Sequence, residues 1–238
     1  MLLLEDKYRK LVNLFNKFIK DKKFFGVYES YDEYCPEVMD IDSFLYYHDK
    51  TVTIESGISK AVLISQDLDY VLKIPFFGQM YSVYNEEDDI YEESWEPFIN
   101  GSGEFRNNYC ETELFFYEEA VDYGVEKMFA AIEAFDVLKC GIPVYKQIKV
   151  RPMNHTDDSC RPKTSAHSKK IAEKYDSSPF DREWVAAAID AYGEKFFKHF
   201  LTFIGEVYPE IGRDMHYGNY GYTLDGKPVL LDYSGWEQ

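Results

Sequence analysis

The feature that constrains the fold most is a change in the spacing of apolar residues near position 50. Residues 4–24 carry apolar side chains at helical spacing with lysines between them, at Leu11, Leu14, Phe15 and Phe18. This spacing predicts an amphipathic helix. Residues 51–76 instead contain three short runs typical of strands, at 51–55, 60–65 and 70–76, with turns at Gly57 and 67–69. A chain with both periods must combine helices with a β-sheet.

The remaining segments follow from the same periodicities and from turn and capping residues. They are a short helix over 42–47, a helix over 107–125 that ends near Gly124, two strands around a turn at 140–143, a short helix over 168–174, a long helix over 180–208 with Asp181 as its N-cap, and a hairpin over 221–233 with its turn at Asp225–Gly226. Strands dominate the first part and helices the second, so the predicted fold class is α+β with two lobes.

The predicted organisation has three parts. Residues 1–50 form an N-terminal helical extension, residues 51–149 a mostly β N-lobe, and residues 150–238 a reduced helical C-lobe that ends in the hairpin. Within the N-lobe, residues 77–106 are strongly acidic and are interpreted as a loop or insertion. A solvated charge run is the favoured interpretation of this insertion, and a surface for a protein partner is the alternative.

Charge excludes several classes of partner. The chain has 26 Lys and Arg against 43 Asp and Glu, a net charge of −17, which repels nucleic acids and anionic membranes. No apolar run approaches the ~20 residues of a membrane helix, and the N-terminus does not resemble a signal peptide. The expected location is therefore the cytoplasm. The four cysteines are widely spaced, so we expect reduced and mostly buried thiols rather than a zinc site or disulfides.

The C-terminal part holds the strongest motif. Asp214 and Asn219 have the D-x-x-x-x-N spacing of a phosphotransferase catalytic loop, and Asp232 follows the apolar run 229–231. An aspartate in such a loop can face an attacking hydroxyl, while the asparagine and a second carboxylate supply the hard oxygen ligands that magnesium prefers. Structural alternatives are a helix or turn cap for Asp214 and a turn for Asp232. His216 is expected to brace the loop.

Upstream residues favour the same chemistry. Lys73 stands among apolar residues in the third predicted strand, where an ammonium group is costly unless it is paired. The next predicted helix carries Glu111 and Glu113 near its start. These two glutamates lie two apart, so only one of them can face the lysine. A snorkelling surface lysine is the structural alternative for Lys73.

Taken in this order, the residues from 52 to 235 resemble the protein-kinase-like fold, closest to its aminoglycoside-phosphotransferase branch. The stretch "DMHYGN" (214–219) resembles the D-x-H-x-G-N loop of that branch, and "VLLDYSG" (229–235) resembles its strand and metal-binding aspartate. The resemblance implies a two-lobed fold, ATP and Mg²⁺ as cofactors, and a transferase activity.

The resemblance also implies a role for each matching residue. Asp214 would be the catalytic base or orient the hydroxyl, and Asn219 and Asp232 would bind magnesium. The remaining residues would hold ATP: Lys73 on its phosphates with Glu111 or Glu113 as partner, Gly57 and Lys60 in the phosphate loop, and Gln147 and Lys149 in a hinge over 145–150 whose backbone holds adenine.

Two departures keep other functions open. Gly212 stands where the fold usually has His, and the phosphate loop keeps only Gly57, with Lys60 at the last glycine position. The first hypothesis is a phosphotransferase that acts on a small, non-peptide acceptor, and the charge of −17 favours a cationic one. The alternatives are a nucleotide-binding or interaction module without turnover, a pseudokinase, and a structural acidic protein that mimics nucleic-acid charge.

Overall fold

The computed structural model describes residues 2–21, 27–29, 37–38, 51–56, 59–76, 78–85, 89–97, 108–156 and 161–234. These residues divide into two compact units. The first comprises Met1–Glu111 and Glu133–Gln147, and the second comprises Thr112–Ile132 and Ile148–Gln238. Both contain helices and antiparallel strands, so the predicted α+β class is confirmed. The short helix predicted over 42–47 lies outside the described residues.

The first unit contains one helix and nine strands in its described part: α1 (Leu2–Asp21), β1 (Val27–Glu29), β2 (Glu37–Val38), β3 (Val52–Ser56), β4 (Lys60–Ser65), β5 (Tyr70–Pro75), β6 (Gly78–Asn85), β7 (Ile90–Pro97), β8 (Ile132–Val137) and β9 (Pro143–Ile148). A five-stranded sheet has the order β3-β4-β5-β9-β8, and a four-stranded sheet has the order β2-β1-β6-β7. The three predicted strands between 51 and 76 and the pair around 140–143 are therefore confirmed.

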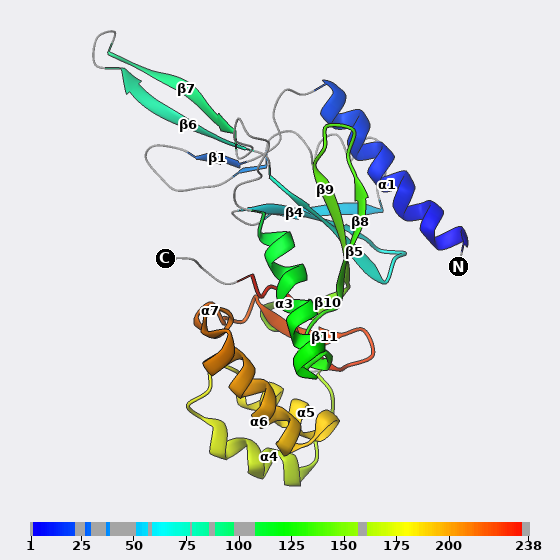
Figure 1. Ribbon diagram of the computed structural model, residues 1–238, viewed down its shortest axis with the longest axis vertical. Helices are drawn as coiled ribbons and strands as arrows, with labels where there is room; N and C mark the ends of the chain where they lie inside the picture. Colours follow the sequence, from blue (N-terminus) through cyan, green and yellow to red (C-terminus); the bar gives the residue numbers. More distant parts are fainter. Residues whose placement is uncertain are drawn as a thin grey trace. The chain divides into compact units, whose positions relative to one another are not determined.

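Helix α1 belongs to the core of the five-stranded sheet. Tyr8, Leu11 and Phe15 on α1 are buried in one cluster with Leu63 and Ile74 on the sheet, and Figure 1 shows α1 running alongside strands β8 and β9. The Tyr70 backbone N–H donates a hydrogen bond to the Tyr8 hydroxyl at 3.2 Å. The structure thus groups α1, which was expected in a separate extension, with the sheet.

The acid-rich segment 77–106 was predicted to be a loop or insertion, and its described residues 78–85 and 90–97 form strands rather than a loop. Strands β6 and β7 form a hairpin through it, with eight register pairs from Gly78↔Pro97 to Asn85↔Ile90. Acids on β7 pair in register with neutral residues, for example Glu92 with Val83, so no acid stands opposite another. Aromatic and β-branched residues in both strands offset the low strand propensity of glutamate.

The second unit contains mainly helices: α3 (Tyr109–Tyr123, which begins in the first unit), α4 (Ala166–Ala172), α5 (Arg182–Tyr192), α6 (Glu194–Thr202) and α7 (Pro209–Arg213). Short helical turns occur at Glu126–Met128, Met153–His155 and Glu173–Tyr175, and a π-helical turn at Phe203–Val207. A three-stranded sheet has the order β10-β11-β12, formed by Val150–Pro152, Tyr220–Thr223 and Pro228–Leu230.

The single long helix predicted over 180–208 is wrong, because the helix breaks at Gly193. This residue has φ 88° and ψ 152°, a conformation that ends α5 and lets α6 begin in a new direction. The predicted N-cap is confirmed, since the Asp181 side chain accepts hydrogen bonds from the backbone N–H groups of Glu183 and Trp184. Gly124, with φ 79°, follows the end of α3 as predicted.

Two further expectations were partly met. Cys110 is buried, but Cys140 is exposed in the turn between β8 and β9, and the other two cysteines lie outside the described residues. Among the described residues, no helix is both long and apolar enough to cross a lipid bilayer.

Candidate active site in the loop before the C-terminal hairpin

The predicted catalytic residues lie in the loop between α7 and β11 and directly after β12. Asp214 follows α7 and is half-buried, and Asn219 precedes β11 and is 5% exposed. Helix α7 has Pro209 at its first position, where proline fits without loss of a hydrogen bond. The β11–β12 hairpin then reverses the chain at Gly226, with φ 83°, and delivers Asp232 next to the loop.

Asn219 connects the three predicted residues. Its side-chain Nδ2 donates to the backbone oxygen of Asp214 at 2.7 Å and to the Asp214 carboxylate Oδ2 at 3.2 Å. Its backbone oxygen accepts hydrogen bonds from Leu231 N–H at 2.9 Å and from Asp232 N–H at 3.4 Å. Because Nδ2 faces Asp214, Oδ1 is the side-chain atom of Asn219 that can serve as a cation ligand.

His216 braces this loop, as predicted. The Gly218 backbone N–H donates to His216 Nδ1 at 3.0 Å, and the Asn219 N–H donates to the His216 backbone oxygen at 2.8 Å. A Cβ atom on Gly218 would lie 2.8 Å from His216 Cε1, so the ring occupies the space that a side chain at 218 would need.

Steric contact explains the glycine at position 212, where the family that the sequence resembles usually has histidine. A Cβ atom at position 212 would lie 2.7 Å from the backbone oxygen of Ile204, and Ile204 lies in the π-helical turn. Such turns often occur at functional sites. The close approach of α7 to this turn therefore needs glycine two residues before Asp214.

An aromatic cluster fixes the hairpin that carries the loop. The Trp184 indole Nε1–H donates to the Gly221 oxygen at 2.9 Å, and the Tyr220 hydroxyl accepts from the Asp181 N–H at 3.0 Å. Burial raises the pKa of Tyr220 to about 12, so this hydroxyl stays protonated. Tyr220 and Tyr222 are buried in the hairpin, whereas Tyr217 is 55% exposed.

The predicted phosphate-binding lysines lie in the five-stranded sheet of the first unit. Lys73 on β5 is 2% exposed and pairs in register with Val62, and Lys60 at the start of β4 is 5% exposed and pairs with Pro75. A surface, snorkelling position is therefore excluded for Lys73. Gly57, the remaining predicted phosphate-loop residue, lies outside the described residues.

The structure separates the two candidate glutamates. Glu111 is exposed, and it forms a reciprocal cap with Asn108, whose Nδ2 donates to Glu111 Oε2 at 3.0 Å and whose Oδ1 accepts from the Glu111 N–H at 3.2 Å. Glu113 is 0% exposed. A carboxylate that is fully buried requires compensation, so Glu113 has the environment expected of a partner for a buried lysine.

The predicted hinge residues lie at the end of β9 and directly after it. Gln147 is 2% exposed, Lys149 is half-buried between β9 and β10, and the Ile148 N–H donates to the Ala131 oxygen at 3.0 Å. Of the predicted residues, Lys60, Lys73, Glu111 and Gln147 belong to the first unit, and Glu113, Lys149, Asp214, Asn219 and Asp232 belong to the second. The structure brings Asp214, Asn219 and Asp232 together.

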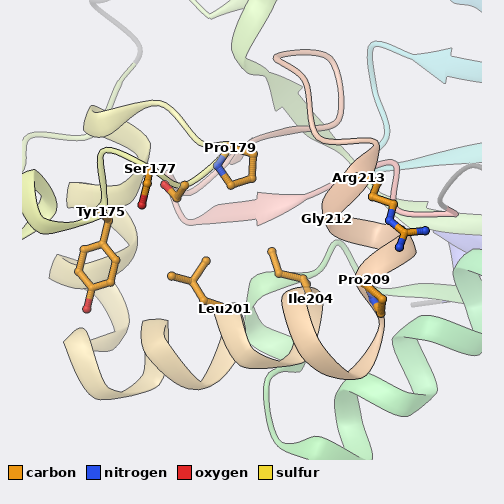
Figure 2. A pocket seen from close by; sticks show the side chains of 10 residues that line it. Tyr175, Ser177, Pro179, Leu201, Ile204, Pro209, Gly212 and Arg213 are labelled. Atoms are coloured by element: carbon orange, nitrogen blue, oxygen red, sulfur yellow. The ribbon is translucent and has the colours of Figure 1, made fainter.

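A pocket that the sequence did not indicate borders this loop within the second unit. It encloses about 440 Å³ and ends at Gly212 and Arg213, directly before Asp214. Figure 2 shows Leu201 and Ile204 pointing from their helical segment toward the loop that carries Pro179. The lining has apolar side chains and the arginine but no carboxylate, so it does not support the cationic acceptor favoured by the net charge.

No group of three or more His, Cys, Asp and Glu side chains in the described part of the chain is arranged to hold a metal ion. The predicted metal ligands, Asn219 and Asp232, are not such a group, because they comprise one amide and one carboxylate. Comparison with protein-family models gave no match, and a search of curated proteins found no significant similarity.

Proposed function

We propose that the chain is a Mg-ATP-dependent phosphotransferase of the protein-kinase-like kind that acts on a small acceptor. The observation that carries the proposal is the set of hydrogen bonds made by Asn219. Its side-chain Nδ2 donates to the Asp214 backbone oxygen at 2.7 Å and to Asp214 Oδ2 at 3.2 Å, and its backbone oxygen accepts from the Asp232 N–H. An aspartate, an asparagine and a second aspartate in this order are the polar residues of a kinase catalytic loop and metal site.

The residues fit a magnesium ion. Asn219 Oδ1 and the Asp232 carboxylate are hard oxygen donors, and magnesium in nucleotide sites is typically held by one or two carboxylates plus phosphate oxygens and water. When bound, magnesium would neutralise the charge of the phosphates. Buried Lys73 would bind the α- and β-phosphates. Glu111 and Glu113 stay the two candidates for its partner, and Glu111 caps its own helix with Asn108.

Asp214 would act on the acceptor. Its carboxylate accepts the hydroxyl proton as the acceptor oxygen bonds to the γ-phosphorus, and the bond from that phosphorus to the β-phosphate oxygen breaks to release ADP. Catalysis would depend mainly on positioning and charge. The neighbouring pocket of about 440 Å³ is in the size range of small-molecule sites, and we propose it as the place where the acceptor binds.

Magnesium-dependent nucleotide binding tests this proposal. ATP at a hundred times its dissociation constant should stabilise the chain by ~2.7 kcal/mol, a rise of roughly 5–10 °C in melting temperature. The shift should require magnesium and disappear in Asp232→Ala. The matched control is Asp225→Ala, which removes an exposed carboxylate paired with Lys227 on the same hairpin and should keep the shift. An equal shift in both variants, or none with wild type, would contradict the proposal.

A further inference from the structure

The hairpin formed by β6 and β7, residues 78–97, is called the acidic hairpin here. Its turn end exposes large side chains: Tyr84, Ile90 and Tyr91 are 42%, 50% and 56% exposed. Tyr84 and Tyr91 are register partners with ring centroids 5.2 Å apart, so they share one face, and neighbouring Ile90 lies on the other. Single exposed apolar residues are common on surfaces, but an exposed aromatic pair with a third apolar residue at the same end of one hairpin is typical of an interaction site.

The acidic hairpin also has an open backbone edge. Strand β7 is the last strand of its sheet in the order β2-β1-β6-β7, so no described strand pairs with its outer side. It is 8 residues long, longer than an average strand. The contact of strand β1 with β6 covers Gln79–Tyr81, near the base of the hairpin, and Figure 1 shows the hairpin extending past β1. An edge of this length can accept an added strand.

The charge of the segment specifies what can bind. Seven acids lie between positions 86 and 96, at Glu86, Glu87, Asp88, Asp89, Glu92, Glu93 and Glu96, and no Lys, Arg or His occurs from 74 to 105. A second copy of the chain would bring the same acids to the same edge, and like charges oppose that pairing. A cationic segment would be attracted, because opposite charges complement each other across an interface.

Protection of the edge against self-pairing is the simpler reason for the acids, since charged residues on edge strands commonly have this effect. Such protection does not account for the exposed aromatic side chains at the same end, which are a liability on an edge that binds nothing. The acids would repel another acidic edge strand, and the exposed apolar side chains would contact apolar side chains of a partner. Together they fit a surface that binds a cationic strand.

We propose that the acidic hairpin binds an extended cationic segment of a partner protein, which adds as a strand along β7. Its backbone would pair with the outer N–H and C=O groups of β7, as in other cases of strand addition. Its lysine or arginine side chains would meet the acids, and its apolar side chains would contact Tyr91 or Ile90. This surface is independent of the proposed phosphotransferase site.

A defined peptide tests the proposal. The probe is a fluorescein-labelled peptide that alternates lysine and valine, and its binding to the full chain is measured by fluorescence anisotropy at low salt. We expect binding that weakens about tenfold or more in the double variant Tyr84→Ser/Tyr91→Ser. The separate variant Glu92→Lys, which reverses one exposed charge, should also bind the peptide more weakly than wild type. Binding should be unchanged in the control Val137→Ser, which alters a side chain that is 59% exposed outside the hairpin. Equal binding by all variants would overturn the proposal.

Two further measurements separate strand addition from simple charge attraction and from self-association. Amide hydrogen exchange in residues 90–97 should slow when the peptide binds, while exchange in β11 stays the same. A peptide of equal composition with its lysines in one block should bind more weakly and give no protection. Equal binding by the blocked peptide, or no protection of β7, would reduce the effect to charge attraction and overturn strand addition. Self-association of the wild-type chain that the double variant lacks would instead identify a second copy as the occupant.

Discussion

Two hairpins of the chain, β11–β12 and the acidic hairpin, differ in almost every respect. In the β11–β12 hairpin every strand residue is buried, and Trp184 donates to the Gly221 oxygen. The acidic hairpin has longer strands and exposes Tyr84 and Tyr91 at its turn end. Buried aromatic contacts hold the first hairpin in one position, as the proposed catalytic loop would require. The second exposes side chains on an edge strand of the described sheet, where we propose that a partner binds.

The largest expected difference between the hairpins is in stability. Trp184 is fully buried, stacks on Phe180 with centroids 4.6 Å apart, and contacts Tyr220 at 5.1 Å. Trp184→Ala should cost ~3–5 kcal/mol, or roughly 6–20 °C in melting temperature. Tyr91→Ser should stay within about 0.5 kcal/mol. Thermal unfolding followed by circular dichroism measures both, and similar losses would remove the basis of the comparison.

A pair of glycine variants tests how closely the β11–β12 hairpin is held. A Cβ atom at Gly221 would lie 1.9 Å from the Arg151 oxygen, while one at Gly205 meets nothing within 4 Å. Gly221→Ala should therefore force β10 and β11 apart at a cost of about 1–3 kcal/mol, and Gly205→Ala should have little effect. Urea denaturation gives both values. Tolerance of alanine at 221 would show that this strand pair adjusts more easily than its packing indicates.

Two asparagines sharpen the comparison at the level of one hydrogen bond. Asn219 in the loop 214–219 is 5% exposed and donates to Asp214, whereas Asn85 in the acidic hairpin donates to Glu92 at 3.1 Å in an exposed setting. Asn219→Ala should cost ~1–2 kcal/mol because the half-buried Asp214 loses the donor to its backbone oxygen and carboxylate, and Asn85→Ala less than about 0.5 kcal/mol. Melting temperatures distinguish these outcomes, and an equal cost would mean that Asn219 does not hold the loop.

The smallest expected effect comes from hydrogen bonds to the Asp190 carboxylate in the second unit. Asp190 at the end of α5 accepts hydrogen bonds from Ser165 at 2.7 Å and Ser168 at 2.8 Å, and these bonds lower the pKa of its carboxyl below the ordinary 3.8. A lowered folded-state pKa stabilises the fold above the unfolded-state pKa, and this contribution disappears as pH falls through the folded-state value. Asp190→Ala should therefore cost no more than about 1 kcal/mol at pH 7, and the difference from wild type should vanish well below pH 4.

Urea denaturation at several pH values measures the Asp190 effect. Ser168→Ala removes one of the two donors and should reproduce part of it with the same pH dependence. A stability difference that persists unchanged into strong acid would show that the Asp190 carboxylate is not its source.

Local patterns predicted much of the fold. The Asp225–Gly226 turn, the Asp181 cap and the three strands between 51 and 76 depend on neighbouring residues, and the structure has all of them. The acidic hairpin could not be predicted from charge, because its strands are stabilised by cross-strand pairs such as Tyr84 and Tyr91, which a run of acids does not reveal. The break at Gly193 was missed because a glycine within a helical pattern has the same appearance whether the helix continues or ends.

The candidate site was predicted in part. The spacing of Asp214, Asn219 and Asp232 indicated that they meet, and hydrogen bonds join them in the second unit. Sequence alone left Glu111 and Glu113 equivalent, because they differ in burial and burial depends on tertiary packing. No sequence signal indicated the pocket beside the loop, since its lining comes from three separate segments around 175–179, 201–205 and 209–213.

The central claim is that Asp214, Asn219 and Asp232 form a phosphotransfer site, and transfer of the γ-phosphate tests it most directly. The full chain is incubated with γ-labelled ATP, magnesium and an extract of small metabolites, and labelled products are identified by mass spectrometry. We predict magnesium-dependent transfer that falls about 10²–10⁴-fold in Asp214→Asn and is unchanged in Asp176→Asn, an exposed acid paired with Arg182. Magnesium-ATP binding without transfer would indicate a nucleotide-binding module, and turnover by Asp214→Asn equal to wild type would contradict the site.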